Sequence, residues 1–204
     1  MTIPETEELC ETCARPPAIC VCDRIETLST RRKVLILQHP QEKKEWLGSA
    51  PLLTASLPKA RLAIGLSWRN LGHALDRPAS SSPGRRWAVL FPDKKASETR
   101  VVNSRGAEMD PADLEGIIAL DGSWSQAKTL RWRNAWLTRL PRISLRPAQP
   151  SIYGKLRREP SRHHVSTLES VAAALTACGE DPEIEKALRR VFRTMVQRYR
   201  DASV

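Results

Sequence analysis

The stretch that decides the fold is Gly116-Ile117-Ile118-Ala119-Leu120-Asp121-Gly122-Ser123-Trp124. Its first half is a short apolar run, which is typical of a buried β-strand. A helix is predicted to follow from residue 125 to residue 140, where Pro141 ends it. A buried strand that turns directly into a helix is the repeating step of an α/β protein.

The rest of the chain repeats this alternation. Further strands are predicted at residues 34–37, 63–66, 87–91 and 142–146, and helices at residues 42–57 (interrupted near Pro51), from Ser166 onward and at 182–200. This order predicts an α/β sandwich with a largely parallel sheet. Ligands of such sheets bind beyond the carboxyl ends of the strands. Three loops begin there, at His39-Pro40, Asp121 to Trp124 and Arg146 to Arg162.

The turn Asp121-Gly122-Ser123-Trp124 is the first candidate site. It places a carboxylate, a flexible glycine, a hydroxyl and an indole where a strand becomes a helix, and a glycine there lets a ligand approach the backbone. A purely structural interpretation is equally open, in which Asp121 and Ser123 cap the helix and Trp124 fills the core.

The second candidate is Ser166-Thr167-Leu168-Glu169, which has the spacing of a capping box before an apolar helix. A capping box alone is a structural device, but helix N-termini also bind carboxylates through their free N–H groups. His163 and His164 precede it without a third metal ligand, so contact with solvent or RNA is the favoured interpretation.

The composition, 41% hydrophobic and 27% charged, is that of a globular protein without a membrane span. The first residues are acidic and lack the apolar core of a secretory signal, so we expect a cytoplasmic protein without membrane contact. No Gly-x-Gly-x-x-Gly or P-loop pattern occurs, which argues against dinucleotide redox chemistry and nucleotide hydrolysis.

Most of the net charge of +10 lies between Lys128 and Arg162, where ten basic residues face one acid, Glu159. Trp132, Trp136 and Tyr153 are interleaved with these cations. A solvated basic face is the simplest interpretation, but cations mixed with aromatic rings favour a nucleic acid. The RNA-binding candidates are Lys128, Arg131, Arg133, Lys155, Arg157, Arg158 and Arg162.

Four of the five cysteines, Cys10, Cys13, Cys20 and Cys22, fall within thirteen residues. In a reducing compartment such a group more often holds a metal than forms disulfides, and two close pairs can fill a zinc tetrahedron. A frayed N-terminus, or cysteines kept for packing, is the alternative. We predict a structural zinc knuckle at residues 1–30 and a catalytic domain at residues 31–204.

In order along the chain, the cysteine pattern, Leu37-Gln38-His39-Pro40-x-Glu42, Asp121-Gly122-Ser123-Trp124 and Ser166-Thr167-Leu168-Glu169 resemble the DTW-domain family. Its members are tRNA-uridine aminocarboxypropyltransferases, with relatives that modify ribosomal RNA. The resemblance spans nearly the whole chain. One departure is visible, because the family usually has Thr at the position of Ser123, so the hydroxyl is kept and a methyl group is lost.

The resemblance implies a fold similar to the knotted SPOUT RNA methyltransferases, a SPOUT-like sheet sandwiched by helices. It also implies S-adenosylmethionine as donor and transfer of its 3-amino-3-carboxypropyl chain to N3 of a variable-loop uridine of tRNA, with methylthioadenosine released. Asp121, Ser123 and Trp124 are then the catalytic candidates, with Asp121 accepting the N3 proton or positioning the base. The donor-binding candidates are Leu120, Asp121, Trp124, Arg146, Ser166, Thr167 and Glu169, and Arg146 is also a candidate for RNA phosphates.

Three other functions remain open at this point. A SPOUT-like methyltransferase would release S-adenosylhomocysteine, and an aminocarboxypropyltransferase could act on ribosomal RNA. A non-catalytic zinc-containing RNA-binding module would need only the cysteines and the basic segment.

Overall fold

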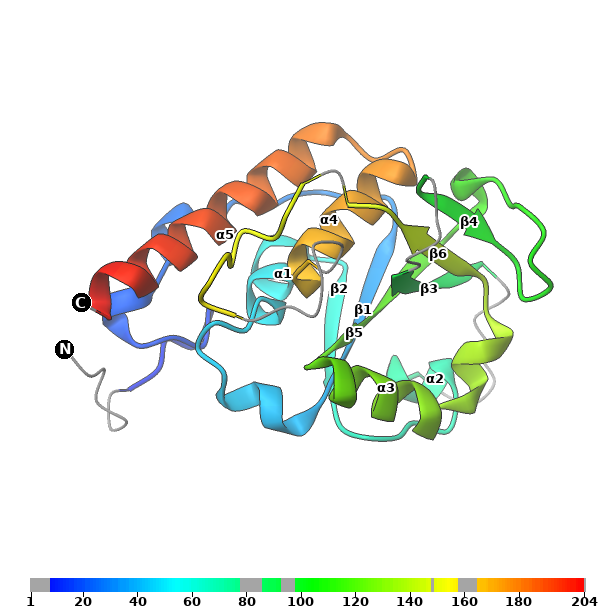
Figure 1. The fold of residues 1–204 in the computed structure, drawn as a ribbon, viewed down its shortest axis with the longest axis horizontal. Coiled ribbons are helices and arrows are strands. Elements are labelled where there is room, and N and C mark those ends of the chain that lie inside the picture. The colour runs from blue at the N-terminus through cyan, green and yellow to red at the C-terminus, as the bar shows by residue number, and fades with distance from the viewer. Residues whose placement is uncertain (1–7, 78–85, 93–97, 148, 158–164, 204) are drawn as a thin grey trace.

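The computed structural model describes residues 8–77, 86–92, 98–147, 149–157 and 165–203, and its α/β fold is built on a six-stranded sheet with helices on both faces (Figure 1). The strands are β1 Lys33–Gln38, β2 Ala60–Ile64, β3 Trp87–Pro92, β4 Arg100–Val102, β5 Gly116–Asp121 and β6 Arg142–Leu145. The α-helices are α1 Ala50–Ser56, α2 Leu71–Ala74, α3 Trp124–Arg133, α4 Thr167–Ala177 and α5 Pro182–Ala202. Short 3-10 helices are η1 Pro17–Ile19, η2 Cys22–Arg24, η3 Pro40–Lys44, η4 Pro111–Asp113 and η5 Ala135–Arg139.

The strand order is β2-β1-β5-β3-β6-β4, and every pairing is parallel except that between β6 and β4. The prediction of a largely parallel sheet is therefore confirmed. The antiparallel edge strand β4 was not predicted, since three residues are too few to show a period. In the register of β1 and β5, Gln38 lies opposite Asp121, so both strands end at the same level.

The apolar runs of the central strands are explained by burial on both faces of the sheet. Val34 and Ile36 of β1 pack in the core cluster that also holds buried residues of α1, α4 and α5. The alternate residues Leu35 and Leu37 pack on the other face, where they join Leu137 of η5. Figure 1 shows α4 and α5 above the sheet and α2 and α3 below it.

Two predicted helices differ from the structure. The helix expected at 42–57 is split into η3 and α1, and Pro51 lies in the first turn of α1, where its missing N–H costs no hydrogen bond. The helix expected at 125–140 ends at Arg133. Asn134 stops it, because its buried side chain donates to the carbonyls of Leu130 (2.7 Å) and Leu66 (3.0 Å).

The connections of the sheet place a crevice between β1 and β5. The chain leaves β1 through α1 toward β2 and leaves β5 through α3 toward β6, so the two crossovers run in opposite directions. Ligands of open α/β sheets bind where the direction reverses, outside the carboxyl ends of the strands. The crevice therefore lies beside Gln38 and Asp121.

The cysteine-rich segment packs against the main core. Cys13 and Val21 are buried in the same cluster as α4 and α5, and η1 contacts α5. Within the part of the chain that the structure describes, no helix has both the length and the apolar composition needed to span a membrane.

Candidate active site and cysteine cluster

A cavity of about 310 Å³ opens at the carboxyl ends of the parallel strands. It is enclosed by the ends of β3, β5 and β6 and by the first turns of α3 and α4. Segments far apart in the sequence thus meet at the carboxyl edge of the sheet. The cavity borders Asp121 but lies on the β3 side of β5, next to the β1–β5 crevice rather than in it. The predicted residues that line it are Leu120, Asp121, Ser123, Trp124, Lys128, Arg131, Arg157, Ser166 and Thr167.

Asp121, the last residue of β5, is 4% exposed and is held by neutral hydrogen-bond donors. Gln38 Nε2 donates to its Oδ2 at 2.8 Å, and Thr167 Oγ1 donates to its Oδ1 at 2.5 Å. A carboxylate offers about four acceptor positions, so both oxygens can still accept a hydrogen bond. The capping interpretation is therefore wrong for Asp121, whose carboxylate bonds to β1 and α4.

Burial raises the pKa of Asp121, and the negative charge of Glu42 acts in the same direction, while the bonds from Thr167 and Gln38 oppose the shift. A carboxylate with a raised pKa binds a proton more readily than one in water. A buried group of this kind that faces a cavity is a candidate proton acceptor.

A second buried carboxylate, Glu42 of η3, pairs with a cation of the cavity wall. Arg157 Nη2 lies 2.8 Å from both Glu42 oxygens, and its guanidinium lies 5.7 Å from the ring centre of Tyr153. Burial works against the charge on Arg157, but the bonds to Glu42 outweigh it and raise its pKa. The guanidinium of Arg157 is thus paired with a carboxylate of the protein itself, whereas the sequence predicted a contact with RNA.

Tyr153, expected to be a stacking face for nucleic acid, is 2% exposed. Its hydroxyl donates to the Leu47 carbonyl at 2.5 Å, and its ring meets Phe192 edge-on at 4.9 Å. Trp136 is half-buried and donates from its indole nitrogen to the Trp68 carbonyl at 2.8 Å. The prediction of exposed stacking rings is therefore wrong for these two residues. Only Trp132 of the three is exposed, at 83%.

The N-terminus of α4 forms one wall of the cavity, and the predicted capping box is present. Ser166 Oγ accepts from Glu169 N at 3.1 Å, and Glu169 Oε2 accepts from Ser166 N at 3.0 Å. Ser166, Thr167 and Ser170 line the cavity.

Glu169, unlike Ser166, Thr167 and Ser170, is not among the residues that line the cavity. It is 1% exposed and also accepts from Ser151 Oγ (2.9 Å) and Ile152 N (3.0 Å), with Arg189 at 3.5 Å. These bonds favour a structural role for Glu169 over the predicted contact with a donor.

The N-terminus of α3 faces the cavity from the other side and carries a second capping box. Ser123 Oγ accepts from Gln126 N at 3.4 Å, so the structural interpretation holds for this hydroxyl. Trp124 is 37% exposed and lines the cavity, which excludes a core role. Gly122 permits close packing here, because a Cβ on it would lie 2.8 Å from Gln126 Cβ.

The remaining predicted residues lie outside the cavity or outside the described residues. Arg146 follows β6 with its backbone N–H bonded to Thr99 Oγ1 at 3.1 Å, and it does not contribute to the cavity lining described here. Arg133 and Lys155 are exposed. Arg158, Arg162, His163 and His164 lie outside the residues that the structure describes.

The four N-terminal cysteines are gathered at a single point, with all four Sγ atoms within 4.8 Å of one another. Cys10 Sγ lies 3.4 Å from Cys22 Sγ, and Cys13 Sγ lies 3.6 Å from Cys20 Sγ. Four sulfurs at about 2.3 Å from a tetrahedral zinc ion are separated by roughly 3.8 Å, so these thiols fit zinc. The backbone N–H of Cys13 is the main cause that lowers the pKa of Cys10 to about 6, whereas burial is the main cause that raises the pKa of Cys22.

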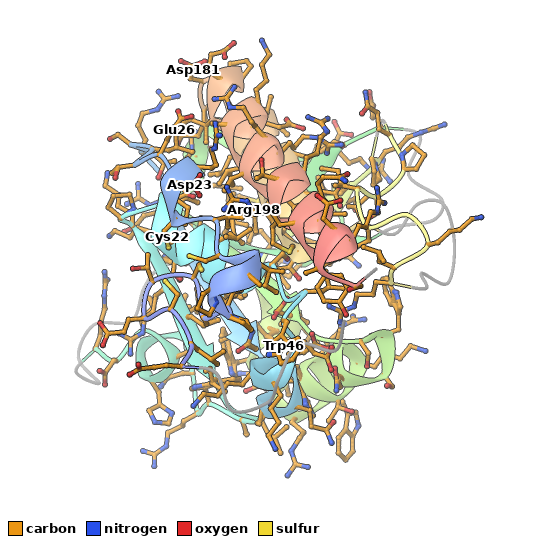
Figure 2. The ribbon with its side chains drawn as sticks, turned by 90° about the vertical axis from the view of Figure 1, so that its left-hand side faces the viewer. Cys22, Asp23, Glu26, Trp46, Asp181 and Arg198 are labelled. Carbon is orange, nitrogen blue, oxygen red and sulfur yellow. The ribbon has the colours of Figure 1, made fainter. Side chains whose placement is uncertain are left out.

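Two arginines attach this cysteine cluster to the rest of the protein. Arg15 is 1% exposed, and it donates to the carbonyls of Cys13 (2.6 Å) and Gly48 (2.5 Å). Arg198 of α5 donates to the Cys20 carbonyl and to both oxygens of Asp23 at 2.8 Å. Figure 2 shows Cys22 and Asp23 beside α5 next to Arg198. The two cations thus lie where four thiolates would accumulate negative charge.

Residues 7–200 match the DTW domain. This chain belongs to the DTW-domain family. The match covers both the cysteine cluster and the cavity, so the two features occur together in one DTW domain.

Curated relatives align with almost the whole of this DTW domain. The chain is similar to tRNA-uridine aminocarboxypropyltransferase 2 of Macaca fascicularis (29% identity over 91% of this chain and 61% of the relative) and of Mus musculus (30%, with the same coverage). It is also similar to tRNA-uridine aminocarboxypropyltransferase A of Arabidopsis thaliana, with 29% identity over 93% of this chain and 80% of the relative. The chain thus spans about 61% of the length of the two mammalian relatives. No solved structure matches the chain.

Sequence reasoning assigned no role to three residues of the DTW domain at this site. Ser49 lines the cavity, and Gln38 and Glu42 bond to Asp121 and Arg157 of its lining. Gln38 and Glu42 belong to the stretch Leu37-Gln38-His39-Pro40-x-Glu42 that carried part of the resemblance, so a signal existed, but it assigned them no role. Ser49 had no signal in the sequence, since only the packing of α1 against α4 brings it to the site. Tyr153 was noted in the sequence only as a ring for stacking, and the structure makes it part of the cavity wall.

Proposed function

We propose that this protein transfers the 3-amino-3-carboxypropyl group of S-adenosylmethionine to N3 of a uridine in tRNA. The observation that carries the proposal is the buried carboxylate of Asp121 beside a cavity lined by Lys128 and Arg131. The names of the family's curated relatives support the same activity. At about 310 Å³ the cavity lies in the size range of small-molecule sites.

Asp121 is the proposed proton acceptor. The uridine N3 gives its proton to a free lone pair of Asp121 and bonds to the Cγ carbon of the transferred chain, while the carbon–sulfur bond breaks. The electron pair of that bond stays on sulfur, which leaves as a neutral thioether in methylthioadenosine. Gln38 and Thr167 act as positioning residues, because they fix the orientation of both Asp121 oxygens.

The donor would lie between the first turns of α3 and α4. When bound, S-adenosylmethionine supplies a sulfonium with three electrophilic carbons, and orientation decides which one reacts. Trp124 and Leu120 offer it apolar surface, and Ser166 and Thr167 at the start of α4 offer polar groups for its carboxylate.

We propose four basic residues as contacts for RNA phosphates: Lys128 and Arg131, which line the cavity, and Arg133 and Lys155, which are exposed. Arg157 has Glu42 as its partner, so we assign it first to the cavity wall. We assign Ser123 to capping α3, which fixes the position of Trp124, the first residue of that helix.

We further propose a structural zinc ion on Cys10, Cys13, Cys20 and Cys22. Four thiolates complete a tetrahedral shell and leave no position for a substrate, which separates this site from the chemistry. A division into a zinc knuckle at residues 1–30 and a catalytic domain at residues 31–204 is part of this proposal. The SPOUT-like knot stays a prediction from the resemblance.

Product analysis tests the proposed activity. The purified protein is incubated with S-adenosylmethionine and unmodified tRNA, and the digested nucleosides and the spent donor are identified by mass spectrometry. We expect an aminocarboxypropyl-uridine and an equal amount of methylthioadenosine. A methylated nucleoside with S-adenosylhomocysteine would overturn the proposal in favour of a methyltransferase. Turnover on ribosomal RNA alone would overturn the target, and RNA binding without turnover would leave a binding module.

A further inference from the structure

The outer side of α3 carries the most exposed large hydrophobic side chain among the described residues. Trp132 is 83% exposed, compared with 46% for Leu9 and 44% for Ile64. A single exposed tryptophan needs no explanation by itself. Its position relative to the cavity and its charged neighbours are what give it meaning.

Trp124, Lys128 and Trp132 are spaced four residues apart and therefore follow one side of α3. Trp124 and Lys128 line the cavity, so Trp132 continues this row beyond its mouth. At 1.5 Å per residue, about 12 Å of helix separates Trp124 from Trp132. The row thus leads from the site of the chemistry to the outer surface.

The charge of α3 has a single sign. Lys128, Arg131 and Arg133 are its charged residues, and the helix contains no acid. An exposed indole next to cations is suited to a nucleotide, because the ring stacks on a base while the cations meet phosphates. A protein partner or a membrane surface would satisfy the indole without requiring this uniform charge.

We propose that Lys128, on the cavity wall, and Trp132, beyond the mouth of the cavity, form a docking face for single-stranded RNA. Trp132 stacks on the base of a nucleotide next to the target uridine, and Lys128 contacts the phosphate between them. Stacked bases lie about 3.4 Å apart. A base on Trp132 and a uridine beside Trp124 are therefore not stacked on each other, so the substrate must present an unstacked segment, such as a loop.

This inference rests on the proposed function for the identity of the target base, but its test does not require turnover. The affinity of the full chain for a short oligouridylate and for unmodified tRNA is measured in Trp132→Ala and Trp132→Phe. Ile64→Ala, which removes an exposed apolar side chain at the end of β2, is the matched control. S-adenosylmethionine affinity is measured by calorimetry in each variant, and circular dichroism checks the fold.

We expect Trp132→Ala to weaken binding of both RNAs by roughly 5–100-fold, the range for loss of one base stack. Trp132→Phe keeps a ring and should stay within about threefold, and Ile64→Ala should bind like the parent. S-adenosylmethionine affinity should not change in any of them. Lys128→Ala should reduce the salt dependence of oligouridylate binding by about 0.7 in slope, as for one phosphate contact on a single strand.

RNA affinity of Trp132→Ala within about twofold of the parent, far below one stack, would overturn the docking face. An equal loss in the Phe and Ala variants would overturn stacking as its basis. If Trp132→Ala loses RNA affinity but the parent shows no transfer, the proposed function fails while the docking face stands. If the parent transfers the group but Trp132→Ala binds RNA as the parent does, the proposed function stands and the docking face fails.

Discussion

The cavity and the cysteine cluster differ in how much of their bonding capacity the protein itself can fill. At the cavity, Asp121 is held by neutral donors and its pKa is raised by burial. At the cluster, four thiols lie together beside two arginines and their pKa values diverge: that of Cys10 is lowered to about 6, chiefly by the backbone N–H of Cys13, and that of Cys22 is raised, chiefly by burial. Asp121 keeps acceptor positions beside open space, whereas a metal on four thiolates has none. Acceptor positions left open beside a cavity are therefore typical of a reactive site, whereas a complete ligand shell is typical of a structural one.

Removing one thiol should have the largest effect on the folded state. Structural zinc contributes about 10–16 kcal/mol in zinc-finger peptides. We therefore expect Cys13→Ser to lose its metal and several kcal/mol of unfolding free energy. Metal analysis of protein purified without added zinc, together with thermal unfolding, measures both.

Cys178→Ser is the matched control, because Cys178 is also buried but lies at the end of α4, away from the cluster. It should keep one zinc ion per chain. Zinc below one-tenth equivalent in the parent protein, with freely titratable thiols, would contradict the zinc site.

Breaking the Glu42–Arg157 pair should have the next largest effect. Loss of one partner of a fully buried pair costs about 3–5 kcal/mol, but the Arg157 side chain is 30% exposed, so we expect a loss of about 1–3 kcal/mol of unfolding free energy for Glu42→Gln.

Glu42→Gln should also change the pH dependence of the transfer rate. Glu42 raises the pKa of Asp121 and Arg157 lowers it. Removing the Glu42 charge therefore lowers the pKa of Asp121, and the acidic limb of the rate profile moves to lower pH.

Single-turnover rates across the acidic pH range and thermal unfolding measure the two effects of Glu42→Gln. Glu45→Gln, on an exposed neighbour of η3, is the control and should leave both unchanged. A shift of the acidic limb to higher pH would show that Glu42 does not act on the proton acceptor.

The smallest effect is expected at Ser123. Its capping bond to Gln126 is long, at 3.4 Å, and exposed, so Ser123→Ala should cost about 0.5–1 kcal/mol, the low end for helix caps. The single-turnover rate should fall by less than about tenfold, below the contribution of a general base. Ser123→Thr, which keeps a capping hydroxyl, should restore both. A loss of 10²-fold or more in Ser123→Ala would return Ser123 to the catalytic residues.

The sequence predicted features that depend on neighbours along the chain. The cysteine cluster, the strand that ends at Asp121 and the capping box at Ser166 all follow from local spacing. Features created by distant contacts were missed or wrongly predicted. Gln38 reaches Asp121 only through the parallel register of β1 and β5. The Asn134 side chain ends α3 by bonding a loop more than sixty residues earlier.

The basic segment shows the same limit. Its composition favoured contact with a nucleic acid, but tertiary packing divides its members. Arg157 bonds Glu42 and Tyr153 is buried, while Trp132 is exposed. Composition reports which side chains are present, and only the fold decides which of them face the solvent.

If Asp121 accepts the N3 proton, Asp121→Asn should slow the chemical step without weakening binding of the donor. The amide keeps the shape but cannot take the proton, so the single-turnover rate should fall roughly 10²–10⁴-fold while S-adenosylmethionine affinity stays close to that of the parent. Although Asp121→Asn should lower the rate, it should not lower the stability of the folded protein. Because the folded-state pKa of Asp121 is raised, its ionised form destabilises the folded protein at neutral pH, and Asn should leave the melting temperature unchanged or higher. A rate within about threefold of the parent, well short of a general base's contribution, would show that another group accepts the proton.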